Sequence, residues 1–181
     1  MPSKAGVYSI YRLVELRQLS ERYWSIEDLR RLFSALHARP EGMRAKIHEP
    51  VRREDVLRSI EHPNFHWVVA VVPDGDGTKL AAMGSLSCLP DPELGGVGHI
   101  DNVVTLPDYQ GKGIGKRIVL ELIRIAASYG RPKNGLNKCN FRVSRVKLTS
   151  SPWRENANEM YAKLGFEIEY PDTNFYRMDL K

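Results

Sequence analysis

The chain of 181 residues contains 42% hydrophobic and 27% charged residues, a composition typical of one globular domain, which we predict over residues 1–181. No apolar run reaches the ~18 to 20 residues that a membrane span needs. The first 24 residues carry scattered charges and no apolar core before a cleavage site, so we expect a cytoplasmic protein that is not bound to a membrane. Cys88 and Cys139 are too few for a disulfide framework and lack metal-ligand spacing, which predicts inert thiols and no metal.

The basic residues are unevenly distributed along the chain. The formal net charge is +5, yet the segment from Lys112 to Arg154 alone holds eleven Lys or Arg residues and one acidic residue, Glu121. Such an excess attracts nucleic acid, an anionic membrane surface or a phosphorylated small molecule. A solvated basic face is the alternative, because lysine and arginine usually lie on the surface.

The first half of the chain predicts a strand, two helices and three further strands. Alternation of apolar and polar residues favours a strand within residues 7–16. The segment over 25–37 opens with Ser25 and has acids at its third and fourth positions, Glu27 and Asp28, as at a helix N-cap. This predicted helix has an apolar stripe of Leu29, Leu32, Phe33 and Leu36. A second helix within residues 52–62 ends before Pro63. The short links between three β-rich runs, the first link with two Asp-Gly pairs, predict an antiparallel meander over 65–72, 79–89 and 99–106.

The second half predicts helices alternating with strands. Residues 114–130 are apolar nearly all round, apart from a polar stripe at Arg117, Glu121 and Arg124, which is typical of a helix buried on most of its surface. A strand over 143–150 follows, then a helix over 154–165 that Gly165 closes at the C′ position. Two final strands are predicted over 166–170 and 174–180.

A glycine-rich turn, DYQGKGIGKRI, stands between the meander and the long helix. It is not a nucleotide P-loop, because only three residues separate Gly111 from Gly115 and Arg117 stands where the magnesium-binding hydroxyl belongs. Nor is it a dinucleotide fingerprint, because Lys116 and Ile118 stand where a third glycine would be needed. The glycines still let the first N–H groups of a helix converge on one anion, so the turn predicts a phosphate site.

Two motifs resemble those of the GNAT superfamily of N-acetyltransferases. The segment GHIDNVVTLPDYQGKGIGKRI is similar to motif A, in which a strand ends in (R/Q)-x-x-G-x-(G/A), here Gln110, Gly113 and Gly115. The segment NEMYAKLGFE is similar to motif B, here Tyr161, Lys163, Gly165 and Phe166. The resemblance covers about residues 6–181. It implies an α/β (α+β) fold of the GNAT type: a mixed central sheet with splayed parallel strands, flanked by about four helices.

The resemblance further implies an acyltransferase that takes acetyl-CoA as cosubstrate. The pantetheine arm is then expected along the strand that carries Val103 and Val104, in a cleft where it splays from the strand over 143–150. Asn158 is a candidate hydrogen-bonding residue for this arm. The pyrophosphate is expected on the N–H groups of Gln110, Gly111, Lys112, Gly113, Ile114, Gly115 and Lys116. The cations at Lys112, Lys116 and Arg117 suit the phosphates.

Acetyl transfer needs a base for the amine and an acid for the leaving thiolate. By the period of two along a strand, His99, Asp101 and Val103 are expected on one face, so that His99 and Asp101 present a base toward the cleft, directly or through water. The choice between the two stays open. The resemblance implies Tyr161 as the general acid. Structural roles in a core or at the surface are the alternatives for all three side chains.

The acceptor is predicted less sharply. Motif A is particularly similar to glucosamine-6-phosphate N-acetyltransferases, which implies an amino-sugar phosphate or another small amine, although the link over 131–145 is longer than is usual there. Alternatives are a protein or peptide N-acetyltransferase and a non-catalytic acyl-CoA-binding module. Nucleic acid is disfavoured, because residues 112–138 contain a single aromatic residue, Tyr129. We expect the loops 38–51, 89–98 and 171–175 to set the acceptor, and the last strands to support a homodimer.

Overall fold

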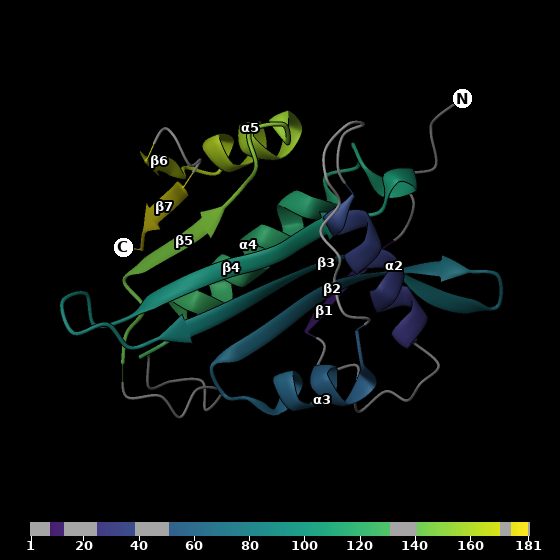
Figure 1. Ribbon diagram of the computed structural model, residues 1–181, viewed down its shortest axis with the longest axis horizontal. Helices are drawn as coiled ribbons and strands as arrows, with labels where there is room; N and C mark the ends of the chain where they lie inside the picture. The colour runs from purple at the N-terminus through teal and green to yellow at the C-terminus, as the bar shows by residue number, and fades with distance from the viewer. Residues whose placement is uncertain (1–7, 13–24, 39–50, 131–140, 171–174, 181) are drawn as a thin grey trace.

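The computed structural model describes residues 8–12, 25–38, 51–130, 141–170 and 175–180 (Figure 1). None of the helices in these ranges is long and apolar enough to cross a membrane. The predicted order of helices and strands is confirmed, with one additional 3-10 turn, η1. In chain order the elements are β1 (Ser9–Arg12), α2 (Ile26–His37), α3 (Arg53–Glu61), β2 (Phe65–Asp74), β3 (Gly77–Leu89), β4 (Val97–Thr105), η1 (Pro107–Tyr109), α4 (Ile114–Ala127), β5 (Arg145–Thr149), α5 (Glu155–Lys163), β6 (Glu167–Tyr170) and β7 (Phe175–Asp179).

The strands form one mixed sheet of seven in the order β1-β2-β3-β4-β5-β7-β6. Antiparallel pairing of β2, β3 and β4 confirms the predicted meander. At its first turn Gly75 has a positive φ, of 58°, whereas Gly77, the glycine of the second Asp-Gly pair, does not. Residues 75 and 76 form a two-residue turn, and Gly77 is the first residue of β3, paired with Asp74. Among the described strands, the one parallel pair is β4 with β5, and β7 lies between β5 and β6. This mixed sheet confirms the predicted fold class.

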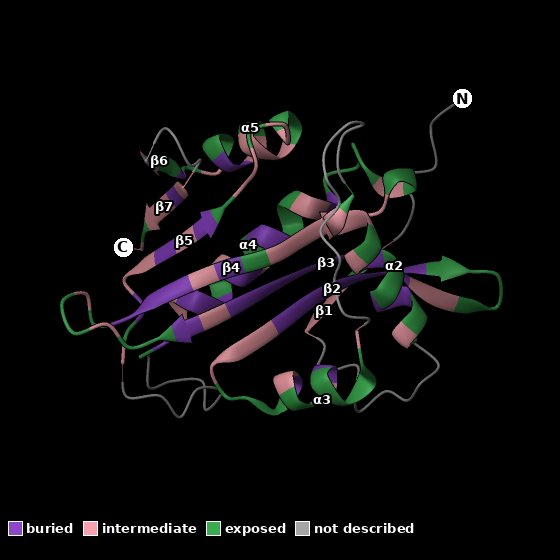
Figure 2. Cartoon of the chain, in the orientation of Figure 1, coloured by how far each residue is buried: buried purple, intermediate pink, exposed green. Residues whose placement is uncertain are grey.

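Helices cover both faces of the sheet and produce two cores (Figure 2). On one face, α4 and α5 pack on the strands through residues such as Ile118, Leu122 and Tyr161. On the other face, α2 and α3 pack through Leu29, Leu32, Val56 and Ile60. In Figure 2 the middle of β2 and of β3 is buried, as expected for strands covered on both sides, whereas β4 is intermediate or exposed beyond Ile100.

Two local features set the positions of the helices. Ser25 caps α2 with a capping box, in which Asp28 N–H donates to Ser25 Oγ at 3.2 Å and Ser25 N–H donates to Asp28 Oδ2 at 3.1 Å. Gly84 lets α4 approach β3 closely, because a Cβ there would lie 2.7 Å from Ile118 Cγ2 and 2.9 Å from Leu122 Cδ1. The long helix is therefore held against the middle of the sheet, where its N-terminus follows the end of β4.

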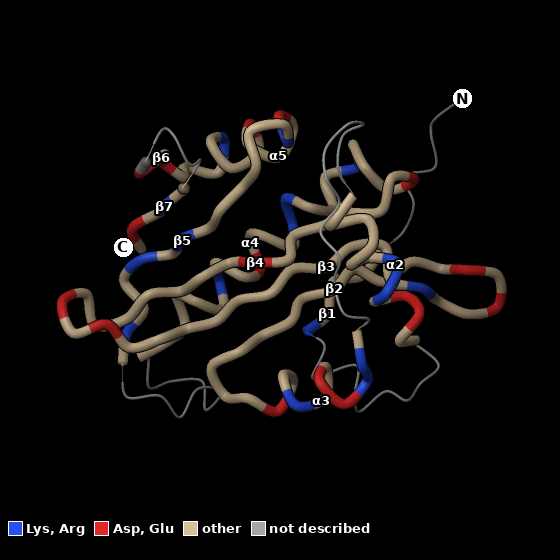
Figure 3. The backbone as a smooth tube through the Cα atoms, in the orientation of Figure 1, with Lys and Arg blue, Asp and Glu red and all other residues tan. Residues whose placement is uncertain are grey.

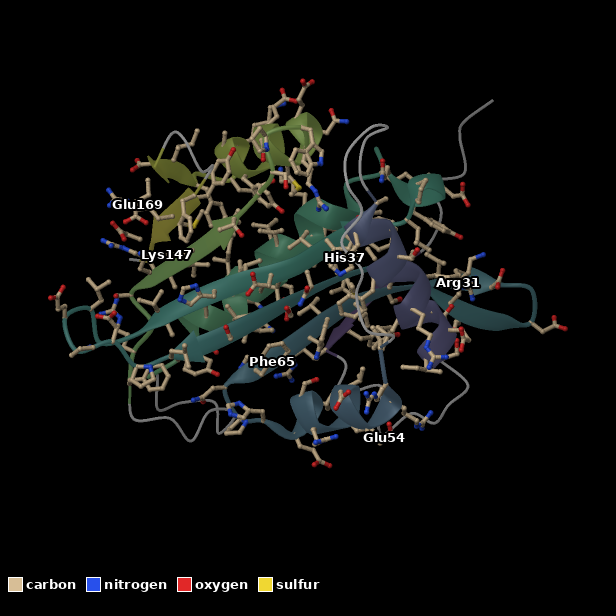
Figure 4. All side chains as sticks on the ribbon, viewed as in Figure 1. Arg31, His37, Glu54, Phe65, Lys147 and Glu169 are labelled. Atoms are coloured by element: carbon tan, nitrogen blue, oxygen red, sulfur yellow. The ribbon has the colours of Figure 1, made fainter. Side chains whose placement is uncertain are left out.

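The basic stretch does not form a single uncompensated face in the described part of the chain (Figure 3). Arg145 Nε lies 2.6 Å from Asp179 Oδ1, and Lys147 Nζ lies 3.3 Å from Glu169 Oε2, so acids from the C-terminal strands pair with cations of β5. Figure 4 shows Lys147 and Glu169 next to each other on this side of the sheet. Lys112, Lys116 and Arg117, at the start of α4, remain exposed. The charge that sequence counting attributes to one segment is thus divided between structural ion pairs and the glycine-rich turn.

Candidate functional site

A cavity opens where the two parallel strands separate. Residues 97–100 of β4 pair with residues 145–148 of β5, and beyond Ile100 the edge of β4 toward β5 has no strand partner in the described part of the chain. Here lies a cavity of about 390 Å³, within the size range of small-molecule sites. It is lined by Leu36, Ile100, Asp101, Asn102, Val103, Leu148, Thr149, Ser150, Ser151, Pro152, Arg154 and Tyr161. The cleft expected between these strands is therefore present.

A β-bulge lies on the β4 side of this cavity. Met83 and Ser85 of β3 oppose Val104 and Asp101 of β4, so β4 carries one extra residue in this interval. Asn102 lies in the bulge with a φ of 56°, the only positive φ of a non-glycine residue in the described ranges. Its Nδ2 donates to Ser85 Oγ at 2.9 Å, and Ser85 Oγ donates to the Asp101 carbonyl at 3.2 Å. Ser85 is buried, so the bulge is fastened from inside the sheet.

The bulge overturns one expectation about side-chain direction. Val103 was expected on the same face as His99 and Asp101, but it packs with Ile100 in the core beneath α4. The extra residue shifts the period of two by one position, which moves Val103 to the opposite face. Val104 correspondingly packs in the core beneath α2.

The two base candidates have different surroundings. His99 and Asp101 flank Ile100, which packs in the core beneath α4, so their side chains face the α2 side of the sheet. On β3 they lie opposite Ser87 and Ser85. Asp101 is exposed and lines the cavity, whereas His99 is half-buried, lies beside Lys147 of β5 and is not among the lining residues. The structure thus brings Asp101, but not His99, to the cavity wall.

Tyr161 lines the cavity from α5. Its ring packs against those of Phe166 and Tyr176, with ring centroids 6.0 and 5.7 Å away. Burial raises the pKa of Tyr161 to about 12, and the nearby charge of Arg154 acts in the opposite direction. The hydroxyl therefore keeps its proton throughout the neutral range and is a proton donor rather than a base.

Asn158 lies one helical turn before Tyr161. Its amide nitrogen makes hydrogen bonds to the backbone, whereas its amide oxygen makes none in the described structure. Its Nδ2 donates to the Ser151 carbonyl at 3.1 Å and to the Pro152 carbonyl at 3.3 Å, which ties the β5–α5 loop to α5. Its Oδ1 is buried and has no hydrogen-bond partner in the described structure. A buried acceptor of this kind costs free energy unless a ligand N–H satisfies it.

The glycine-rich turn has the backbone geometry that an anion site requires. Gly111 and Gly113 have left-handed φ values of 73° and 75°, and Gly113 is the N-cap of α4, with no side chain capping the helix. The first-turn N–H groups are thus left for an external acceptor. Gly115 has an ordinary φ, but a Cβ there would lie 3.2 Å from Thr105 Oγ1, so it permits a close approach of α4 to β4.

Side chains of the turn are held by neighbouring backbone. Gln110 Nε2 donates to the Thr105 carbonyl at 3.1 Å, and Lys112 Nζ donates to the Asp108 carbonyl at 2.9 Å while lying 5.1 Å from the Tyr109 ring centroid. Lys116 is exposed, and Ile114 is buried in the core, so its N–H alone is available to a ligand. These contacts fix the course of the chain from β4 into α4.

Several lining residues were missed by the sequence analysis. Arg154 was counted there only as part of the basic stretch, and Leu36, Asn102 and Ser151 carried no chemical signal. The position of Arg154 just before the motif B helix is the one local sign that could have indicated it. The predicted acceptor loops 38–51 and 171–175 and the link 131–145 lie largely outside the described residues.

Comparison with known proteins identifies the family. The model of the acetyltransferase (GNAT) family matches residues 13–166. Glucosamine 6-phosphate N-acetyltransferase of Trypanosoma brucei brucei is 38% identical over 88 residues, which are 46% of this chain and 50% of that protein. Thialysine N-epsilon-acetyltransferase of Mus musculus is 25% identical over 124 residues, which are 66% of this chain and 65% of that protein. The chain thus spans half to about two thirds of the length of these curated relatives.

Solved structures share the fold. A Trypanosoma brucei acetyltransferase has a TM-score of 0.57 at 23% identity, with 91% of this chain and 95% of that chain covered. Glucosamine-6-phosphate N-acetyltransferase from Arabidopsis thaliana has a TM-score of 0.55 at 23% identity, with 91% and 94% covered. At these identities the likeness concerns the fold alone. The match to the family model over most of the chain shows the family: the chain belongs to the acetyltransferase (GNAT) family, which uses acetyl-CoA.

Proposed function

We propose that this chain transfers the acetyl group of acetyl-CoA to the primary amine of a small molecule, by direct attack in a ternary complex. The observation that carries the proposal is the cavity between β4 and β5, whose wall holds a carboxylate, Asp101, and a protonated phenol, Tyr161. These are the two proton-handling groups that the reaction needs.

The residues present fit acetyl-CoA. Backbone N–H groups from Gly111 to Lys116 would bind the pyrophosphate at the α4 N-terminus, whereas the Gln110 N–H already donates to the Pro107 carbonyl at 3.1 Å. The edge of β4 that carries Val103 and Val104 would pair with the amides of the pantetheine arm, since β5 no longer occupies it. Asn158 Oδ1 would accept a hydrogen bond from the same arm, which would satisfy its buried oxygen.

Asp101 and Tyr161 would divide the proton transfers. The amine nitrogen attacks the thioester carbonyl carbon, the C–N bond forms, and Asp101 takes the proton that the amine releases, directly or through a water. His99, farther along the same strand face, would assist rather than contact the amine. The C–S bond breaks, and Tyr161 donates its proton to the departing thiolate. Exchange with solvent then returns both groups to their starting states.

The acceptor we favour is an amino-sugar phosphate, the class named by one relative, with another small amine, such as the lysine analogue named by the other, as the second candidate. A protein N-acetyltransferase and a non-catalytic acyl-CoA-binding module are the alternatives. Pairing of the last strands in a homodimer stays a prediction.

Release of free thiol from acetyl-CoA, measured with amino sugars, amino-sugar phosphates, amino acids, polyamines and peptide N-termini, tests the proposal. We expect release with small amines, and at least about a 100-fold lower kcat for Asp101→Asn and Tyr161→Phe. Asp76→Asn, which changes an exposed carboxylate in the β2–β3 hairpin, is the matched control and should retain activity. Measurable binding of CoA without thiol release for any amine would leave the non-catalytic module as the function.

A further inference from the structure

Arg154 crosses the cleft between the two helical layers. It immediately precedes α5, and its Nη2 donates a hydrogen bond to the carbonyl of Leu36 in the last turn of α2. Because α2 and α5 pack on opposite faces of the sheet, this bond connects the two layers at the place where β4 and β5 separate. Both Arg154 and Leu36 line the cavity.

The cavity wall has one positive and one negative side chain. Among the described lining residues, Arg154 is the only cation and Asp101 the only acid. A guanidinium carries five N–H donors, and the bond to Leu36 uses one of them. The planar arrangement of the others matches the two oxygens of a carboxylate or a phosphate.

We propose that Arg154 is a specificity-determining residue that selects amine acceptors bearing a phosphate or carboxylate group. The inference rests on the proposed function, since it concerns the acceptor of the same site. The ammonium group of such an acceptor enters beside Asp101 and loses its proton there, while its anionic group pairs with Arg154. A cationic polyamine would instead bring a second positive charge next to Arg154, which disfavours it.

Two other roles for Arg154 predict that its removal would affect all acceptors equally. If it only joined α2 to α5, its removal would lower stability and affect every acceptor alike. If it only acted on Tyr161, whose pKa its charge influences, its removal would again change all acceptors by the same factor. Only if Arg154 binds an anionic group of the acceptor would its removal lower the activity more for some acceptors than for others.

Matched acceptor pairs separate these roles. Glucosamine 6-phosphate and glucosamine differ by the phosphate, and lysine and cadaverine differ by the carboxylate. We expect wild-type kcat/KM to favour the anionic member of the pair that the enzyme uses. Arg154→Ala should lower kcat/KM for that member by about 10- to 100-fold, the range of hydrogen bonds to charged groups, and for the neutral or cationic member by less than about threefold. The pair that responds shows whether phosphate or carboxylate is the natural group.

Controls make the result decisive. Arg154→Lys keeps the charge without the planar fork and should recover part of the preference. Arg58→Ala removes an exposed arginine of α3 and should leave both acceptors unchanged. The KM for acetyl-CoA and the midpoint of thermal unfolding monitor cosubstrate binding and stability.

Two outcomes would overturn the inference while leaving the proposed function intact: thiol release without any wild-type preference for the anionic member, or an equal loss for both members in Arg154→Ala. Absence of thiol release with every amine would instead overturn the proposed function, and this inference with it.

Discussion

Asn102 Nδ2 donates to Ser85 Oγ over 2.9 Å, which ties the left-handed residue of the β4 bulge to the neighbouring strand. Ser85 Oγ in turn donates a hydrogen bond to the Asp101 carbonyl at 3.2 Å. The residue that we propose as the base therefore lies next to a strained position that a buried hydroxyl holds in place. Strain of this kind persists where the surrounding structure compensates for it, and it is frequent at functional sites.

Substitution of Asn102 tests this strain. Asn102→Val places a β-branched side chain at a φ of 56° and should lower the free energy of unfolding by about 3 kcal/mol. Asn102→Gly relieves the strain but loses the bond to Ser85, so a loss of at most about 1 kcal/mol is expected. Urea denaturation measures both values, and equal losses in the two variants would contradict the assignment of strain to Asn102.

The glycine turn provides a second test. Gly113→Val should raise the KM for acetyl-CoA about 10-fold or more, because a φ of 75° is unfavourable for valine and the first-turn N–H groups would move. Gly75→Val is the matched control. Gly75 also has a positive φ, 58°, and a Cβ added there would meet no atom within 4 Å beyond its chain neighbours, but it lies in the β2–β3 hairpin. Steady-state kinetics in which both variants show the same KM as the wild type would place the cosubstrate elsewhere.

Tyr161 should affect catalysis far more than binding. Tyr161→Phe keeps the ring contacts and removes the proton donor, so kcat should fall by about 10² to 10⁴ with little change in KM. Because the pKa of Tyr161 is raised to about 12, kcat of the wild type should show no decline from its ionisation below about pH 11. Tyr176→Phe, on the adjacent ring and outside the cavity lining, should retain kcat. A fall in kcat of the same size in both variants would indicate that the aromatic packing, and not the proton of Tyr161, is what catalysis requires.

Acid should destabilise the fold through His66. Burial, with the charges of Arg12 and His62, lowers the pKa of His66 to about 4, and its Nε2 lies 2.6 Å from Tyr129 Oη. The unfolded chain binds a proton near pH 6.5 but the folded chain only near pH 4, so stability is full above pH 6.5 and falls as the pH decreases between these values. The total loss is up to about 3 kcal/mol.

Urea unfolding between pH 7 and 4 measures this dependence. His66→Gln should flatten the slope, whereas His62→Gln removes only the smallest of the three causes of the lowered pKa and should keep most of the slope. An unchanged slope in His66→Gln would show that another group causes the acid sensitivity.

Much of the fold could be predicted because its signals are local. The cap at Ser25, the stripe of Leu29 and Leu32, and the helix end at Gly165, which has a φ of 89°, each depend on residues within one or two turns. The same holds for the glycine turn before α4. The order of helices and strands, the glycine turn before α4 and the cleft beside β4 followed from such patterns and from the resemblance of the two motifs.

Tertiary structure alone decided how the wall of the cavity is composed. The position of β7 between β5 and β6, the bulge that turns Val103 away from Asp101, and the bond of Arg154 to Leu36 across 118 residues depend on pairing between distant segments. A one-residue change of register reverses every later side chain of a strand, and no local propensity determines that register. The sequence by itself therefore determined the elements and the family, whereas the packed sheet determined which charges meet in the cleft.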